Sequence, residues 1–164
     1  MKLHVLGLLL LLLPIASTAY GQADKAPKVS QYSAKVEKAL VKSINFKKNP
    51  EARTFRTRLS EALKGGVNFA GHYIVASWGC GTGCINSGII DARNGNVYWP
   101  RELGSVVDWV VETTYVNEPL DYRKNSRLLM LHGTPGNDTR AGKYYYELKD
   151  NRLRLVKFVK LESN

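Results

Sequence analysis

The spacing of the two cysteines, Cys80 and Cys84, points more clearly to a defined chemistry than any other pattern in this chain. They flank Gly81, Thr82 and Gly83. A three-residue hairpin loop commonly ends in a left-handed residue, which suits Gly83. Residues that flank such a loop face each other at roughly 4.5–5.5 Å, within the range of a disulfide. The spacing therefore predicts a structural disulfide that closes a hairpin tip.

Two other cysteine chemistries remain as alternatives. A redox pair usually has two intervening residues and lies at the start of a helix, where the dipole lowers the thiol pKa. A zinc site needs more Cys or His ligands than this region offers. Gly79, Gly81 and Gly83 alternate like a phosphate cradle, but that motif requires a helix directly afterwards, where we expect a strand. We therefore expect no metal and no cofactor.

Three polar residues, His72, His132 and Asp91, are the candidates for acid–base chemistry. Both histidines fall in predicted strands, where a histidine is more often a hydrogen-bonded core residue than a catalyst. Asp91 precedes a turn, and we expect its carboxylate to accept hydrogen bonds from the turn backbone. The Gly-x-Ser-x-Gly elbow of serine hydrolases is absent from the sequence.

The first 21 residues predict a secretory signal peptide. Lys2 is followed by an apolar run over 5–15 and by small residues over 16–21. The apolar run is too short to span a bilayer comfortably. We expect residues 22–164 to form one secreted domain without a membrane span, in the periplasm or outside the cell. That compartment is oxidising, which favours a disulfide over free thiols.

The charge of the chain is strongly positive, with 24 basic and 14 acidic residues and a formal charge of +10. Such a charge is typical of proteins that bind anionic polymers, lipid head groups or acidic proteins, and also of ordinary soluble proteins. The lysine- and arginine-rich stretch 25–58 is the candidate surface. Nucleic acid is not an expected partner, because secretion removes the usual target.

The N-terminal half predicts helices followed by strands. Apolar residues recur at helical spacing over 30–43 and, more clearly, over 50–64. Asn49 is the expected cap of the second helix, and Gly65-Gly66 ends it. Strands are expected over 69–78, 88–93 and 96–99, with a two-residue turn at Asn94-Gly95. The first of these strands carries apolar residues on both faces, which is typical of a covered central strand.

The C-terminal half predicts further strands. They cover 105–116, where a helix is the alternative, then 127–132, and a hairpin over 143–148 and 152–161. The apolar alternation changes phase at Val156, which indicates a bulge. Tyr144, Tyr145 and Tyr146 indicate cross-strand packing or, alternatively, an aromatic binding patch. The resulting fold class is α+β, a single antiparallel sheet of six or seven strands with the N-terminal helices packed on one face.

The segments 68–73 and 78–84, Asn-Phe-Ala-Gly-His-Tyr and Trp-Gly-Cys-Gly-Thr-Gly-Cys, resemble a group of small secreted bacterial proteins of unassigned activity. A looser likeness is to the Ivy-type periplasmic inhibitors of lysozyme, in which a Tyr-x-Val strand runs into a disulfide-closed loop that blocks the enzyme's cleft. The likeness implies the same arrangement of a strand leading into a disulfide-closed loop, and a loop that is presented to a partner. It implies no target, because the inhibitor loop is longer and carries a histidine.

These observations favour a non-enzymatic periplasmic binding or inhibitor module. The expected binding residues are Trp78, Gly81, Thr82 and Gly83, and the expected partner is an envelope protein. One alternative is a cell-envelope hydrolase that uses His72, His132 or Asp91. Another is a basic protein that binds anionic envelope polymers. The oligomeric state is not predicted.

Overall fold

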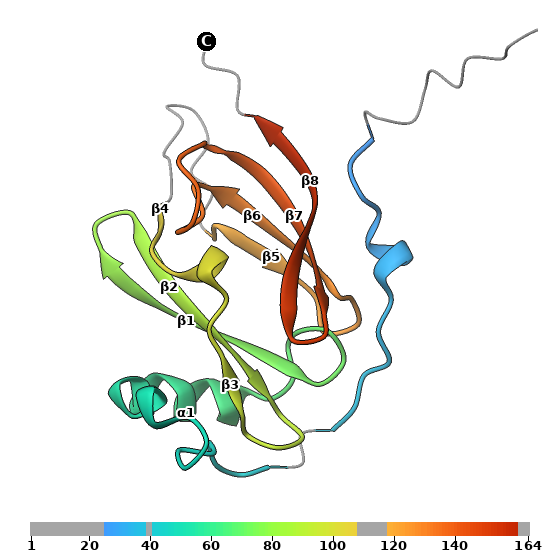
Figure 1. Cartoon of the computed structure of the whole chain (residues 1–164). Helices are drawn as coiled ribbons and strands as arrows, with labels where there is room; N and C mark the ends of the chain where they lie inside the picture. The colour runs from blue at the N-terminus through green and yellow to red at the C-terminus, as the bar shows by residue number, and fades with distance from the viewer. Residues whose placement is uncertain (1–24, 39–40, 108–117, 161–164) are drawn as a thin grey trace, which may run out of the picture.

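The computed structural model describes residues 25–38, 41–107 and 118–160 (Figure 1). Within these described residues, two antiparallel sheets of four strands each form the body of the fold. Sheet one contains β1 (Tyr73–Gly81), β2 (Cys84–Asp91), β3 (Val97–Tyr98) and β4 (Val106–Val107). Sheet two contains β5 (Leu120–Tyr122), β6 (Leu128–Gly133), β7 (Gly142–Lys149) and β8 (Arg152–Lys160).

The predicted single sheet of six or seven strands is therefore wrong. In the part of the chain that the structure describes, the strands divide into two sheets, and the fold is mostly β with one substantial helical stretch. Pro100 ends the pairing of β3, and the short 3-10 helix η3 (Arg101–Leu103) follows it. The two sheets meet through a bridge in which the Val107 and Thr134 backbones exchange hydrogen bonds of 3.0 Å. Strand patterns alone do not tell whether a new strand extends a sheet or starts a second one.

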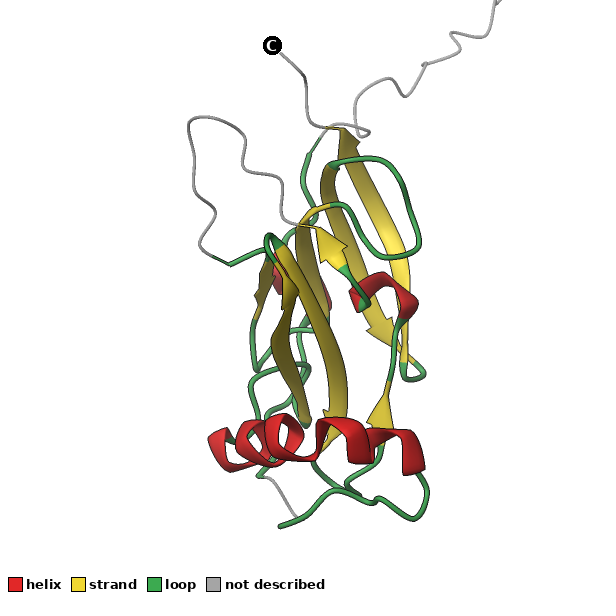
Figure 2. Cartoon of the chain, turned by 90° about the vertical axis from the view of Figure 1, so that its left-hand side faces the viewer, coloured by secondary structure: helices red, strands yellow, loops and turns green. Residues whose placement is uncertain are grey.

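β1 is not the predicted central strand, because the strand order β1–β2–β3 places it at the edge of sheet one and β2 in the centre. Sheet one is nevertheless covered on both faces along the buried parts of β1 and β2, as the apolar pattern predicts. One face, with Tyr73, Val75 and Ile89, packs against sheet two. The other face, with Ile74 and Ile90, packs against the helical stretch. Figure 2 shows that stretch lying across the lower end of the strands.

The helical stretch consists of the 3-10 helix η2 (Pro50–Phe55) and the α-helix α1 (Arg56–Gly65). Its apolar stripe faces the sheet, with Leu59 fully buried, and Gly66 ends it at φ +81°, as predicted. Asn49 occupies the N-cap position of η2, as predicted, but its side chain makes no capping hydrogen bond to the helix. The Asn49 amide donates to the Asn45 carbonyl and accepts from the Val97 backbone, so it ties the helix start to β3.

The helix predicted over 30–43 is also wrong. In the described parts of this range, 30–38 and 41–43, the one helical element is a 3-10 turn, η1 (Val29–Tyr32), and 33–38 is not helical. The Ala34 amide donates to the Asn125 carbonyl and the Glu37 amide to the Gly71 carbonyl. These hydrogen bonds to other segments replace the internal ones of a helix.

Several strand boundaries differ from the prediction. β1 begins at Tyr73 instead of residue 69, because Ala70 and Gly71 adopt left-handed φ angles of +45° and +86° and turn the chain. The bulge is confirmed, because Tyr145 pairs with Lys157 and Tyr146 with Leu155, which leaves Val156 unpaired. Of the stretch 105–116, Val106–Val107 is a strand and 108–117 lies outside the described residues, as does the predicted signal peptide. No helix in the described part of the chain is long and apolar enough to cross a membrane.

Candidate functional site

The disulfide between Cys80 and Cys84 is present, and its two Cα atoms lie 5.2 Å apart. The hairpin differs in register from the predicted one, because Cys84 pairs with Gly81 and Cys80 occupies a bulge. The turn itself is Thr82-Gly83, in which Gly83 has φ +63° and Gly81 before it has φ +143°. The ring closed by the disulfide therefore contains two glycines whose conformations other residues rarely adopt.

The tip is exposed but firmly supported. Cys80, Gly81, Thr82 and Gly83 are all exposed, while the ladder behind them runs without interruption from Gly79 to Tyr73. β4 pairs with the base of the tip at Cys84 and Ile85. In addition, the Ser105 amide donates to the Asn86 side chain at 2.6 Å. A partner would meet a closed ring held in one position.

Trp78, which the sequence places among the binding residues, faces the helical stretch. Its ring centroid lies 4.5 Å from that of Phe55 and 6.1 Å from that of Trp99. The Trp99 indole donates to the Glu51 carboxylate at 3.1 Å. Trp78 is half-buried in this aromatic cluster, so it anchors the hairpin to the helix and the tip itself offers Thr82 and backbone.

The Asp91 carboxylate is buried and fully engaged in its turn. It accepts from the Arg93 backbone at 2.9 Å, from the Arg93 guanidinium at 3.2 and 3.3 Å, and from the Asn94 amide at 3.0 Å. This confirms the expected bonds to the turn. The predicted two-residue turn is wrong, because the Asn94 and Gly95 amides both donate to the Asp91 carbonyl in a longer loop. An Asp with both oxygens occupied in this way is not placed to act as a general base.

The two histidines lie in different places. His72 precedes β1, with its ring centroid 4.1 Å from that of Tyr73 and its Nδ1 4.0 Å from a Glu37 carboxylate oxygen. Burial, and then the charge of Arg93, lower the pKa of His72. His132 lies in β6, opposite Lys143 at the start of β7, whereas the Tyr73 hydroxyl reaches Asn151 beyond the other end of β7. About 20 Å of strand separates these two ends.

The three tyrosines of β7 favour packing over an aromatic patch. Tyr144 and Tyr146 are buried between the sheets with ring centroids 6.0 Å apart, and Tyr145 is half-buried on the outer face. Burial is the main cause that raises the pKa of both Tyr144 and Tyr146. These phenols therefore stay neutral at physiological pH.

A cluster of positive charge lies around the helical stretch. Residues 42–64 carry only two acidic side chains, Glu51 and Glu61, and Glu61 pairs with Arg58 at 3.8 Å. The exposed cations of this stretch are Lys42, Lys47, Lys48, Arg53, Arg56, Arg58 and Lys64. This basic surface, 42–64, overlaps the lysine- and arginine-rich stretch 25–58 that the sequence singled out and continues six residues beyond it.

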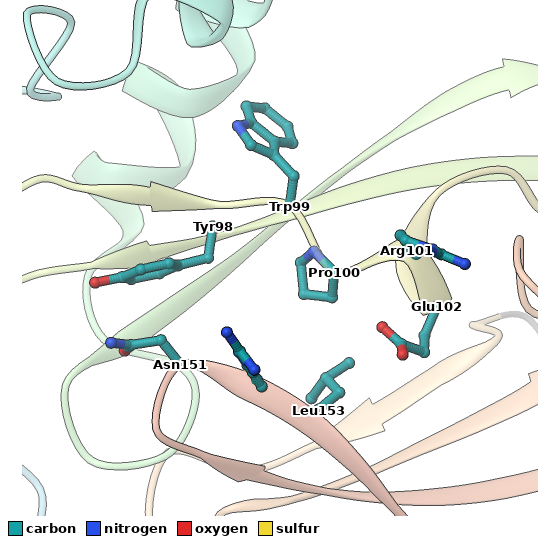
Figure 3. A pocket seen from close by; sticks show the side chains of 8 residues that line it. Tyr98, Trp99, Pro100, Arg101, Glu102, Asn151 and Leu153 are labelled. Atoms are coloured by element: carbon teal, nitrogen blue, oxygen red, sulfur yellow. The ribbon is translucent and has the colours of Figure 1, made fainter.

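A hollow of 320 Å³ between the two sheets is a feature that sequence reasoning missed (Figure 3). One wall is the link Tyr98–Glu102, and the other is formed by Asn151, Arg152 and Leu153. The two walls are about fifty residues apart in the chain, so no local motif could have revealed them. Among the residues that the structure describes, no group of three His, Cys, Asp or Glu side chains could hold a metal ion.

Comparison with known proteins yields no relative. No family model, no curated protein and no solved structure matches the chain. Functional inference therefore rests on the geometry of the chain itself.

Proposed function

We propose that this protein is a non-enzymatic periplasmic or secreted binding module that presents the disulfide-closed tip of the β1–β2 hairpin to a protein partner. The observation that carries the proposal is the combination of exposure and rigid support at the tip. Every residue from Cys80 to Gly83 is exposed, yet a disulfide, two left-handed glycines and β4 fix its shape. Preorganisation of this kind reduces the conformational entropy lost on binding.

The chemistry of the tip limits how it recognises a partner. Thr82 is the only side chain at the turn, so recognition rests on the backbone amides and carbonyls and on one hydroxyl. A narrow, closed ring of this kind fits into a cleft, which is the style of use seen in the Ivy-type inhibitors. The candidate catalytic residues support a binding role, because the Asp91 carboxylate is engaged and the two histidines lie far apart.

The test is capture of a partner from bacterial periplasmic extract by the full secreted chain. Four proteins are compared: wild type, the double variant Cys80→Ser/Cys84→Ser, Thr82→Lys, and Thr57→Lys as a matched control. Thr57 is exposed on α1, so its substitution adds the same charge far from the tip. We expect wild type and Thr57→Lys to retain the same partner and both tip variants to lose it. Equal capture by all four proteins would refute the presented tip.

The basic surface around the helical stretch supports a second candidate function, binding to an anionic envelope polymer. Seven exposed cations against two acidic residues produce a field that attracts polyanions. Binding of this type would survive both tip substitutions and fall steeply with added salt, because salt screens exposed charges. Titration with polyglutamate at two salt concentrations separates this function from the first, and Arg53→Ser should weaken it.

A further inference from the structure

The hollow in Figure 3 has the properties of a small binding site. Its volume of 320 Å³ falls at the lower end of the range for ligand pockets, about 300–1,000 Å³. Tyr98, Pro100 and Leu153 supply apolar surface, whereas Trp99 directs its ring away from the hollow toward the aromatic cluster. The hollow therefore has a small apolar lining, and Glu102, Asn151 and Arg152 supply its polar groups.

One wall of the hollow is held in a fixed and unusual conformation. Asp150 and Asn151, at the turn between β7 and β8, both adopt left-handed φ angles, +52° and +59°. The Tyr73 hydroxyl donates to the Asn151 side-chain oxygen at 2.5 Å, which ties this turn of sheet two to sheet one. Asp and Asn tolerate the left-handed region better than other non-glycine residues. The wall is thus set before any ligand arrives.

The polar groups around the hollow are uncommitted. Glu102 is half-buried, and its carboxylate makes no hydrogen bond or ion pair with any residue that the structure describes. Within the same described residues, neither the Tyr98 hydroxyl nor the Arg152 guanidinium has a partner. The Glu102 charge is also a cause, after burial, of the raised pKa of Tyr146, so this carboxylate lies close to the core. A partly desolvated carboxylate without a partner is costly.

These features narrow the class of ligand. An apolar ligand would bury Glu102 without a hydrogen bond. A simple anion would be repelled by the same carboxylate. A sugar ring suits Glu102, Arg152 and Asn151, because its hydroxyls donate to the Glu102 carboxylate and accept from the Arg152 guanidinium and the Asn151 amide. The apolar face of the ring then packs on Tyr98.

We propose that this hollow binds one sugar unit of a neutral glycan. The site is separate from the hairpin tip, because its walls are the link after β3 and the β7–β8 turn. The proposal does not depend on what the tip binds. It assigns to the chain a second site with its own ligand.

The test uses two neutral trisaccharides, tri-N-acetylchitotriose and maltotriose, with the full secreted chain. Neutral probes are essential, because the formal charge of +10 would attract acidic sugars without any defined site. Titration followed by NMR should show saturable binding of at least one probe, with a dissociation constant of about 1 mM or tighter. Resonances of Tyr98 and Asn151 should shift.

Two substitutions in the hollow and two matched controls complete the experiment. Glu102→Gln and Arg152→Gln should each weaken binding at least tenfold. Glu61→Gln and Arg58→Gln make the same chemical changes on α1 and should leave affinity unchanged. Urea midpoints verify that all four variants are folded. Failure of both probes to saturate, or unchanged affinity in Glu102→Gln and Arg152→Gln, would overturn the proposal.

Discussion

Removal of the disulfide has an effect on stability that can be worked out from the structure. The bond joins residues four apart in sequence, so it closes a very short loop. In the chain-entropy treatment, a loop of about five residues restricts the unfolded state by about 7 cal/mol/K, which corresponds to about 2 kcal/mol at 25 °C. The double variant Cys80→Ser/Cys84→Ser should therefore lose about 2 kcal/mol of unfolding free energy and keep its fold.

Urea unfolding followed by tryptophan fluorescence measures this loss. Trp78 and Trp99 lie in the aromatic cluster with Phe55, so their emission reports the packing of the helical stretch on sheet one. The wild-type protein measured with reductant should match the double variant measured without it. Mass spectrometry of unreduced protein should show both thiols of the wild type linked to each other.

Two results would refute the reasoning. Equal unfolding free energies for variant and wild type would show that the bond does not restrict the unfolded chain as calculated. A loss above about 4 kcal/mol would show that the fold itself requires the bond, since so short a loop cannot supply that much entropy.

Three further predictions concern packing, backbone conformation and pH. Phe55→Ala should cost about 2–3 kcal/mol of unfolding free energy, below the range for a fully buried Phe because the ring is half-buried. Arg56→Ala should cost only about 0.5–1 kcal/mol, through the lost contact with the Phe46 ring. Equal urea midpoints for the two variants would show that the Phe55 face of the helix does not pack against the sheet. Gly95→Ala should cost at least about 1 kcal/mol more than Gly66→Ala. Both glycines have left-handed φ angles, but only at Gly95 would a Cβ atom meet a backbone carbonyl, at 2.6 Å; a similar cost in thermal unfolding would contradict this. In the folded state the pKa of His72 lies below its ordinary value of 6.5, mainly through burial. Its contribution to stability is therefore present above pH 6.5 and is lost as the pH falls below that value. A His72→Gln variant should lose less stability on acidification than wild type, and parallel pH profiles of stability would exclude a contribution from His72.

The sequence by itself determined the features whose signals are local. The disulfide, the left-handed Gly83, the helical stripe with its glycine stop, and the bulge at Val156 all depend on residues within a few positions of one another. Backbone sterics and side-chain periodicity fix such features before distant segments meet. Asp91 belongs to this group, because its carboxylate bonds the turn that directly follows it.

Other features were decided only by tertiary contacts between distant segments. The division into two sheets, the turn of Trp78 toward the helix and the use of Asn49 to hold β3 all depend on which surfaces meet. An apolar strand face can be covered by a second sheet or by helices, so the strand pattern is the same in either case. The hollow beside Glu102 arises from the stacking of the two sheets, because its two walls belong to different sheets and come together only in the folded chain.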